Sequence, residues 1–160
     1  MTRAGTRRYR ADTAQPNTSN ALSRFTMETL ALYVAAATLG AMLFFAAGVA
    51  PTVFQALPVE QAGLFLRKLF PRYYLALIVG SGLAGCLWIS SAPLAASICW
   101  LIALSTLWVR QRLVPQINQL RDAELAGDAA AGARFATLHR VSVIINMVQL
   151  LALVVLLLKY

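Results

Sequence analysis

The chain has 160 residues, of which 59% are hydrophobic and only 12% are charged, and its mean hydropathy is +0.67. Soluble domains are about 45–50% apolar and about 25% charged, so this composition predicts a protein that resides in a lipid bilayer. The formal net charge is +8, from 14 basic and 6 acidic residues. The basic residues flank apolar runs and do not alternate with stacking aromatics, which argues against nucleic acid as a partner and indicates membrane topology signals.

Residues 1–26 are polar and basic, with a single acidic residue, Asp12, and no helical periodicity. This composition is typical of a disordered tail. A transit peptide has a similar composition, whereas a secretory signal is shorter and less basic. In a third interpretation Met27 is the true start and residues 1–26 are an over-extended gene model. We expect a disordered basic tail over 1–26 and one membrane domain over 27–160.

The first apolar run covers residues 29–50, about the length that a helix needs to cross the hydrocarbon core. Pro51 is expected to end this helix, because proline cannot continue the hydrogen-bond ladder. Residues 58–70 form an amphipathic segment with apolar side chains on one helical face: Val59, Ala62, Leu66 and Leu69. That pattern predicts a short helix lying in the membrane interface.

Three further apolar runs cover residues 73–91, 94–109 and 141–158. Pro115 is expected to kink or end the third span, and a weaker amphipathic pattern follows it. Each run is close to the spanning length. The sequence therefore predicts an all-α membrane protein, a compact bundle of four transmembrane helices with a short interfacial helix after the first.

The basic residues predict an orientation. The two loops over 52–72 and 110–140 carry eight of them: Arg67, Lys68, Arg72, Arg110, Arg112, Arg121, Arg134 and Arg140. The opposite side carries six if the tail is present, or only Lys159 if Met27 is the start. Because loops rich in Lys and Arg stay in the cytoplasm, we expect both termini outside and a multi-pass protein of the bacterial inner membrane.

Small residues recur at intervals of four in two spans. The first span carries Ala36, Gly40 and, after Phe44, Gly48. The second carries Ala76, Gly80 and Ala84, with Ser81 and Gly85 on a neighbouring row. Lipid tails give no hydrophobic drive between helices, so such rows let helix backbones approach closely. They support a compact bundle and indicate no function.

The last span holds a polar stripe, with Ser142, Asn146 and Gln149 on one face and His139 one turn earlier. Polar side chains in hydrocarbon need partners, so this face is expected to point into the bundle. Two interpretations stay open. The stripe lines a polar cleft for a headgroup, ion or cofactor, or Asn146 and Gln149 form hydrogen bonds between helices.

His139 is the only histidine and therefore the candidate ligand for a metal ion or haem. The alternative is an interfacial hydrogen-bonding residue at a helix mouth. His139 and Ser142 lie on one helix without an oxyanion hole, which argues against a Ser/His hydrolase. Nucleotide-binding and zinc-protease motifs are absent, and no acidic residue lies within a span, which argues against a proton pump. We expect no enzyme, and the cofactor stays unknown.

Three stretches carry a family resemblance: GAMLFFAAGVAPTVFQAL over 40–57, EQAGLFLRKLFPRYY over 60–74 and RFATLHRVSVIINMVQLLAL over 134–153. They resemble the transmembrane protein 205-like family, also called domain of unknown function 4149. This resemblance implies a four-span membrane protein with no settled biochemical activity. A more distant similarity links the chain to copper-resistance D-like membrane proteins, in which metal or haem handling is suspected.

The span count places several residues of these stretches on one membrane side, where we expect them to form a mouth: Pro51, Phe54, Phe70, Pro71, Arg72, His139 and Arg140. The predicted ligand-binding residues are His139, Arg140, Ser142, Asn146, Gln149, Pro51, Phe54 and Arg72, with His139 as a metal ligand.

Two functional hypotheses follow. In the first, the protein binds or moves a small ligand, such as a metal ion or a lipid-like molecule, through the polar cleft. In the second, it is an accessory subunit that packs in a homo-oligomer or against a larger membrane complex. The first predicts a cavity that reaches Asn146 from the His139 side. The second predicts a closed core and small residues facing membrane lipids.

Overall fold

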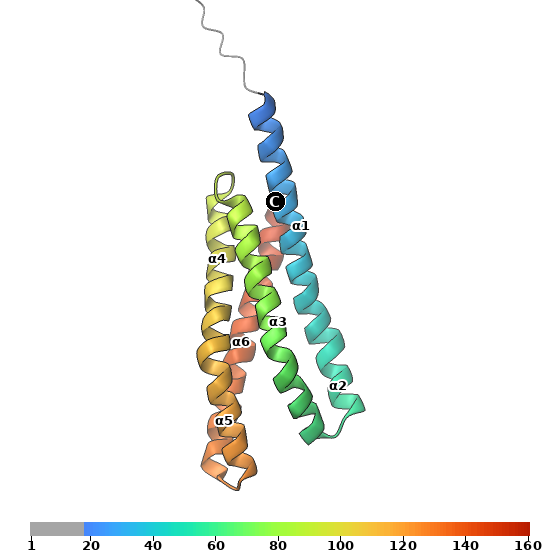
Figure 1. Cartoon of the computed structure of the whole chain (residues 1–160), viewed down its shortest axis with the longest axis vertical. Helices are drawn as coiled ribbons and strands as arrows, with labels where there is room; N and C mark the ends of the chain where they lie inside the picture. Colours follow the sequence, from blue (N-terminus) through green and yellow to red (C-terminus); the bar gives the residue numbers. More distant parts are fainter. Residues whose placement is uncertain (1–17) are drawn as a thin grey trace, which may run out of the picture.

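The computed structural model describes residues 18–160, and this part of the chain is helical apart from three short turns and the last residue. The described helices run up and down in chain order (Figure 1). They comprise α1 (Thr18–Leu43), the π-helical η1 (Phe44–Val49), α2 (Ala50–Ala56), α3 (Val59–Trp88), α4 (Pro93–Trp108), the π-helical η2 (Val109–Leu113), α5 (Val114–Leu125) and α6 (Ala129–Lys159). Joined end to end they make four helices long and apolar enough to cross a membrane, which confirms the predicted fold class.

The first helix starts earlier than the hydropathy indicates. α1 begins at Thr18, inside the segment for which the composition predicts disorder. Hydroxyl groups in this part donate to carbonyls one turn back, from Thr26 to Leu22 and from Thr29 to Phe25, so polar residues continue the helix. Residues 1–17 lie outside the described residues, and the disordered tail and the start at Met27 stay predictions.

Pro51 does not end the first span, contrary to expectation. In the π-helical segment before it, hydrogen bonds run from residue i to residue i+5, one residue further than in an α-helix. The N–H of Ala50 accordingly donates to the carbonyl of Phe45, and the helix then continues past the proline to Ala56. Pro115 follows η2 in the same way. Each proline therefore sits where the hydrogen-bond register has just changed.

The short interfacial helix expected over 58–70 is not a separate element, because α3 continues through Pro71. The amphipathic face exists, but it packs on a neighbouring helix. Ala62 and Leu66 form a small buried cluster with Val53 of α2. Contact with α2 therefore keeps this stretch in line with the rest of α3.

The upper half of the bundle, as drawn in Figure 1, closes around the small residues of α3. Gly80 lies against Thr38 of α1, where an added Cβ would overlap the threonine hydroxyl. Gly85 lies against Trp100 of α4, where a Cβ would be 2.8 Å from the indole ring. The predicted row of α3 therefore lets two neighbours approach closely.

The predicted row of the first span has no such role in the described chain. Ala36 and Gly40 are exposed. No atom lies within 4 Å of a Cβ built on Gly40, and only Phe44 of the same span lies that near Gly48. This face of α1 points away from the bundle.

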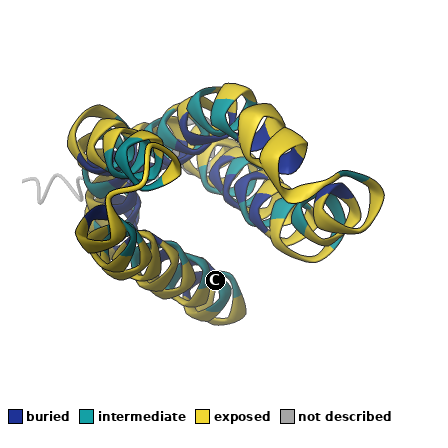
Figure 2. Cartoon of the chain, turned by 90° about the horizontal axis from the view of Figure 1, so that it is seen from below, coloured by how far each residue is buried: buried dark blue, intermediate teal, exposed yellow. Residues whose placement is uncertain are grey.

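The lower ends of the bundle separate into two hairpins. The turn between α2 and α3 lies on one side and the turn between α5 and α6 on the other, as the side view and the view from below both show (Figures 1 and 2). Buried residues gather on the inner faces of the helices, and exposed residues cover the outside (Figure 2). The turn over 89–92 and Tyr160 lie at the opposite, upper end.

Candidate functional site

A cavity of about 460 Å³ lies between the lower ends of the two hairpins. Its walls are mainly apolar: Phe54, Val59, Leu64, Leu66, Phe70, Val114, Ile117, Leu125 and Phe135. Its polar lining consists of Glu60, Arg67, Tyr74, Asn118, Arg121, Asp122, His139 and Ser142. Small-molecule sites in proteins are typically about 300–1,000 Å³ in volume, mostly apolar, with a few placed polar groups. The size and composition of this cavity fall within that class.

An ion pair spans the mouth of the cavity from α3 to α5. The guanidinium of Arg67 donates to both carboxylate oxygens of Asp122, at 2.8 and 3.2 Å, and to the carbonyl of Asn118 at 3.3 Å. Near the turns these helices extend beyond the length that a hydrocarbon core requires, which places the pair at the aqueous interface. The hydrogen bonds from Arg67, and secondarily its charge, hold the pKa of Asp122 below its usual range.

A stack of three side chains forms the wall on the α5–α6 side. The guanidinium carbon of Arg121 lies 5.3 Å from the centre of the Phe135 ring. The His139 ring stacks on Phe135, with centres 5.8 Å apart and planes inclined by 14°. Arg121 also pairs with Glu124 at 2.6 Å. The charge of Arg121 is therefore compensated within its own helix.

Tyr74 and Ser142 lie at the inner end of the cavity, furthest along their helices from the turns. Tyr74 is 6% exposed and its ring stacks on Phe70 at 5.6 Å between centres. Ser142 is also buried, and its hydroxyl donates to the carbonyl of His139 at 2.7 Å. The Tyr74 hydroxyl has no hydrogen-bond partner among residues 18–160. It is a donor without a partner there, in a cavity whose walls are mainly apolar.

The upper members of the polar stripe bind other helices. The hydroxyl of Tyr73 donates to the Asn146 carbonyl oxygen at 3.3 Å, and the Asn146 amide nitrogen lies 3.2 Å from the same hydroxyl. The amide of Gln149 donates to the hydroxyl of Ser105 on α4 at 2.8 Å. Asn146 and Gln149 therefore link α6 to α3 and to α4.

The predicted site residues fall into three groups. Phe54, His139 and Ser142 line the cavity. Asn146 and Gln149 do not line it and form the interhelical bonds described above. The remaining three are exposed and lie outside the lining: Pro51, Arg72 and Arg140. Arg72 donates to the carbonyl of Lys68 within its own helix. The structure thus gathers part of the predicted mouth and leaves the rest on the surface.

Several lining residues were not identified from the sequence. Arg67 and Asp122 are 55 positions apart and meet only because α3 and α5 lie side by side. Tyr74 stands at the start of the apolar run over 73–91, and no periodicity distinguishes a free hydroxyl from a paired one. The amphipathic patterns are the usable signal, because Val59 and Leu66 of the segment over 58–70, and Ile117 and Leu125 of the weaker pattern after Pro115, line the cavity.

No group of three or more His, Cys, Asp or Glu side chains lies together within residues 18–160. A metal ion at His139 would therefore have this imidazole as its main protein ligand there, whereas protein metal sites commonly use three or four. The assignment of His139 as a metal ligand stays a prediction.

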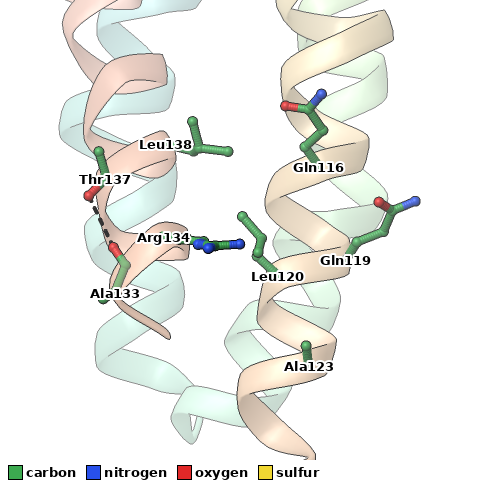
Figure 3. Close-up of a pocket in the computed structure, with 8 residues that line it drawn as sticks. All are labelled: Gln116, Gln119, Leu120, Ala123, Ala133, Arg134, Thr137 and Leu138. Carbon is green, nitrogen blue, oxygen red and sulfur yellow. Dashed lines mark hydrogen bonds between the residues drawn. The ribbon is translucent and has the colours of Figure 1, made fainter. Parts of the chain in front are cut away.

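A second, more open groove runs along the outer side of α5 and α6, with a volume of about 720 Å³. Arg134 of α6 and Leu120 of α5 point toward each other across it (Figure 3). Gln116 and Gln119 lie along α5, and the Thr137 hydroxyl is engaged with the Ala133 carbonyl of its own helix (Figure 3). Gln116, Gln119 and Arg134 are exposed, so the more enclosed cavity between the hairpins is the stronger candidate.

Comparison with known proteins gives a family and no function. The family model named domain of unknown function (DUF4149) matches residues 33–126, which extend from α1 to the turn after α5. No curated protein and no solved structure matches the chain. The matched region contains the stretches over 40–57 and 60–74 and covers more than half of the chain. The chain therefore belongs to the DUF4149 family of domains of unknown function.

Proposed function

We propose that this membrane protein binds a small lipid-like molecule in the cavity between its two hairpins. The observation that carries the proposal is the cavity of about 460 Å³, with apolar walls and a polar rim at one end of the bundle. Its position at the end of the spans gives access both to the acyl region and to the headgroup region of a bilayer. An amphiphilic ligand matches that combination.

A metal ion is the less well supported cargo. The cavity is lined mainly by carbon, and its one imidazole, that of His139, stacks on Phe135. Elemental mass spectrometry and visible absorbance of the purified protein, with His139→Ala as the control, test this. A stoichiometric metal or haem that disappears in His139→Ala would replace the lipid-like ligand in our proposal.

A second candidate function is that of an accessory subunit in a membrane complex or a homo-oligomer. The face of α1 that carries Ala36 and Gly40 supports it, because small exposed residues let a partner helix approach closely. Cross-linking in membranes through single cysteines at these positions tests it. Dimers or adducts specific to this face would favour assembly as the main role.

We also propose assignment to the transmembrane protein 205-like group, location in a bacterial inner membrane and both termini outside. The eight basic residues over 52–72 and 110–140, in the parts of the helices next to the two lower turns, support the orientation. Fusions of alkaline phosphatase and of green fluorescent protein after Tyr160 test it in a bacterial host. Active phosphatase with a dark fluorescent fusion is expected, and the reverse result would place the C-terminus in the cytoplasm.

The test of ligand binding is extraction and mass spectrometry of the detergent-purified protein. We expect a lipid-like molecule enriched over empty detergent micelles. Ile117→Trp fills the cavity and is expected to remove this enrichment, whereas Leu104→Trp, on an exposed face of α4, is expected to preserve it. Equal extracts from the wild type and both variants would refute binding in this cavity.

A further inference from the structure

The polar groups of the cavity define the class of ligand, provided that the proposed binding function holds. A ligand adds most at those polar groups that have no hydrogen-bond or ion-pair partner in the protein. A polar group that already has a hydrogen-bond partner in the protein gains little from a ligand. A donor without a partner among apolar side chains costs free energy unless a ligand accepts its hydrogen bond.

The cationic groups of the cavity are already compensated. Arg67 is bound on both sides of its guanidinium to Asp122, and Arg121 is paired with Glu124. The remaining carboxylate of the lining, Glu60, lies in the first turn of α3, where the helix dipole favours a negative charge. An anionic headgroup would therefore have to displace a carboxylate before it could bind either arginine.

The polar side chains of the lining that form no hydrogen bond within residues 18–160 include a neutral donor, the hydroxyl of Tyr74, and the side-chain amide of Asn118. The Tyr74 ring is held on two sides, by Phe70 at 5.6 Å and by Tyr73 at 5.4 Å between ring centres, which fixes the direction of its hydroxyl. The residue is 6% exposed, lines the cavity and has no hydrogen bond to the described chain. His139, at the same wall as Ser142, adds an imidazole that is stacked but not hydrogen-bonded within residues 18–160.

We propose that the ligand is a neutral, largely apolar molecule with an acceptor oxygen of the ester or quinone type, which takes a hydrogen bond from Tyr74. Its apolar part lies along the carbon-lined walls, between Leu66 and Ile117. The ion pair of Arg67 and Asp122 stays intact at the mouth. Binding then gives a partner to a hydroxyl that has none within residues 18–160, and it uncovers no charge.

The experiment measures the affinity of purified protein in detergent for four probes with a common ten-carbon chain. They are a decyl-substituted benzoquinone, methyl decanoate, decyl phosphate and decylbenzene. The two neutral carbonyl probes are expected to bind more tightly than decylbenzene and than decyl phosphate. The better of the two identifies the source of the acceptor, quinone or ester.

Tyr74→Phe keeps the stacked ring and removes only the hydroxyl. It is expected to weaken the carbonyl probes about threefold to tenfold, the effect of one net hydrogen bond, and to leave decylbenzene unchanged. Tyr73→Phe is the matched control, because the Tyr73 hydroxyl is bound to Asn146 and does not line the cavity. If Tyr74→Phe does not fold, the infrared carbonyl stretch of the quinone on wild-type protein replaces it, with a downward shift expected relative to micelles.

The outcomes separate the two proposals. Tighter binding of decyl phosphate, an equal loss of all probes in Tyr74→Phe, or an unshifted carbonyl stretch would overturn the neutral acceptor while leaving the cavity as a ligand site. Equal binding of decylbenzene and the carbonyl probes would do the same. If no probe binds, or if Ile117→Trp binds every probe as the wild type does, the cavity is not a ligand site and both proposals fail.

Discussion

The upper and lower halves of the bundle differ in the side chains that α3 presents to its neighbours. In the upper half Gly80 lets α1 approach α3 closely and Gly85 lets α4 do so, and Leu77 and Trp88 of α3 are buried in the core. In the lower half α3 presents Arg67 and aromatic rings to its neighbours, and these side chains line the cavity. Because a bilayer supplies no hydrophobic drive between helices, side-chain size on the central helix decides whether a section closes or stays open.

The lower half is nevertheless ordered within each hairpin. The Phe45 ring of η1 stacks on Tyr73 of α3 with centres 4.2 Å apart, which holds the first hairpin together. Polar links between the hairpins include the Arg67–Asp122 pair, the bond of 3.3 Å from the Arg110 side chain to the carbonyl of Pro71, and the contact of Tyr73 with Asn146. The cavity therefore lies between two hairpins that these contacts join.

The largest expected effect is on the closed half. Gly85→Ala places a methyl group 2.8 Å from Trp100 and 3.2 Å from the backbone oxygen of Ala96, so the helices must separate. We expect a loss of about 1–3 kcal/mol of unfolding free energy, the usual cost of overpacking. Gly82→Ala is the control, because nothing lies within 4 Å of its Cβ. Denaturant titration in micelles measures both, and equal stability of the two variants would contradict close packing at Gly85.

A smaller effect is expected from the hydrogen bond between Tyr73 and Asn146, which joins α3 to α6. The coupling energy between Tyr73→Phe and Asn146→Ala in a double-mutant cycle should be about 0.6 kcal/mol and below about 1.7, the range for hydrogen bonds between membrane helices. The geometry behind it is the reciprocal contact at 3.2 and 3.3 Å. Additive effects of the two substitutions would show that the amide and the hydroxyl do not interact. Leu151→Ala, on an exposed face of α6, should not couple to Tyr73→Phe.

The smallest effect on stability is expected at the mouth of the cavity, where a substitution should instead change the distance between α3 and α5. Asp122→Asn removes the charge partner of Arg67, and exposed pairs contribute little to stability. We expect an unchanged free energy of unfolding and a longer distance between spin labels at positions 65 and 119. The labels are attached after Cys86 and Cys99 are replaced by serine. Glu60→Gln is the control and should leave the distance unchanged.

The same labels test the pH dependence of the mouth in the wild type. The pKa of Asp122 is lowered by Arg67, so its carboxylate stays charged throughout the neutral range. The pair is therefore present above the usual carboxyl pKa and is lost only as the pH falls through the lowered value. An increase in the label distance near neutral pH would show that a group other than Asp122 controls the opening of the mouth.

Expectations from the sequence held where a property follows from local composition. Four apolar runs predicted four spans, and the small row at Gly80 predicted close packing. They failed where the hydrogen-bond register or a contact with another helix outweighs the preference of a single residue or segment. Pro51 continues a helix because η1 changes the hydrogen-bond register, and the amphipathic segment before Pro71 joins α3 because it packs on α2.

The sequence by itself determined that the chain spans a membrane four times, since hydropathy and length are summed along the chain. It also determined that the last span needs partners for its polar stripe. Only the tertiary structure decided how those polar groups are used. Asn146 and Gln149 bind Tyr73 and Ser105 on other helices, while the Tyr74 hydroxyl has no partner within residues 18–160. That division depends on distances between helices, which side-chain size sets and no single-helix pattern contains.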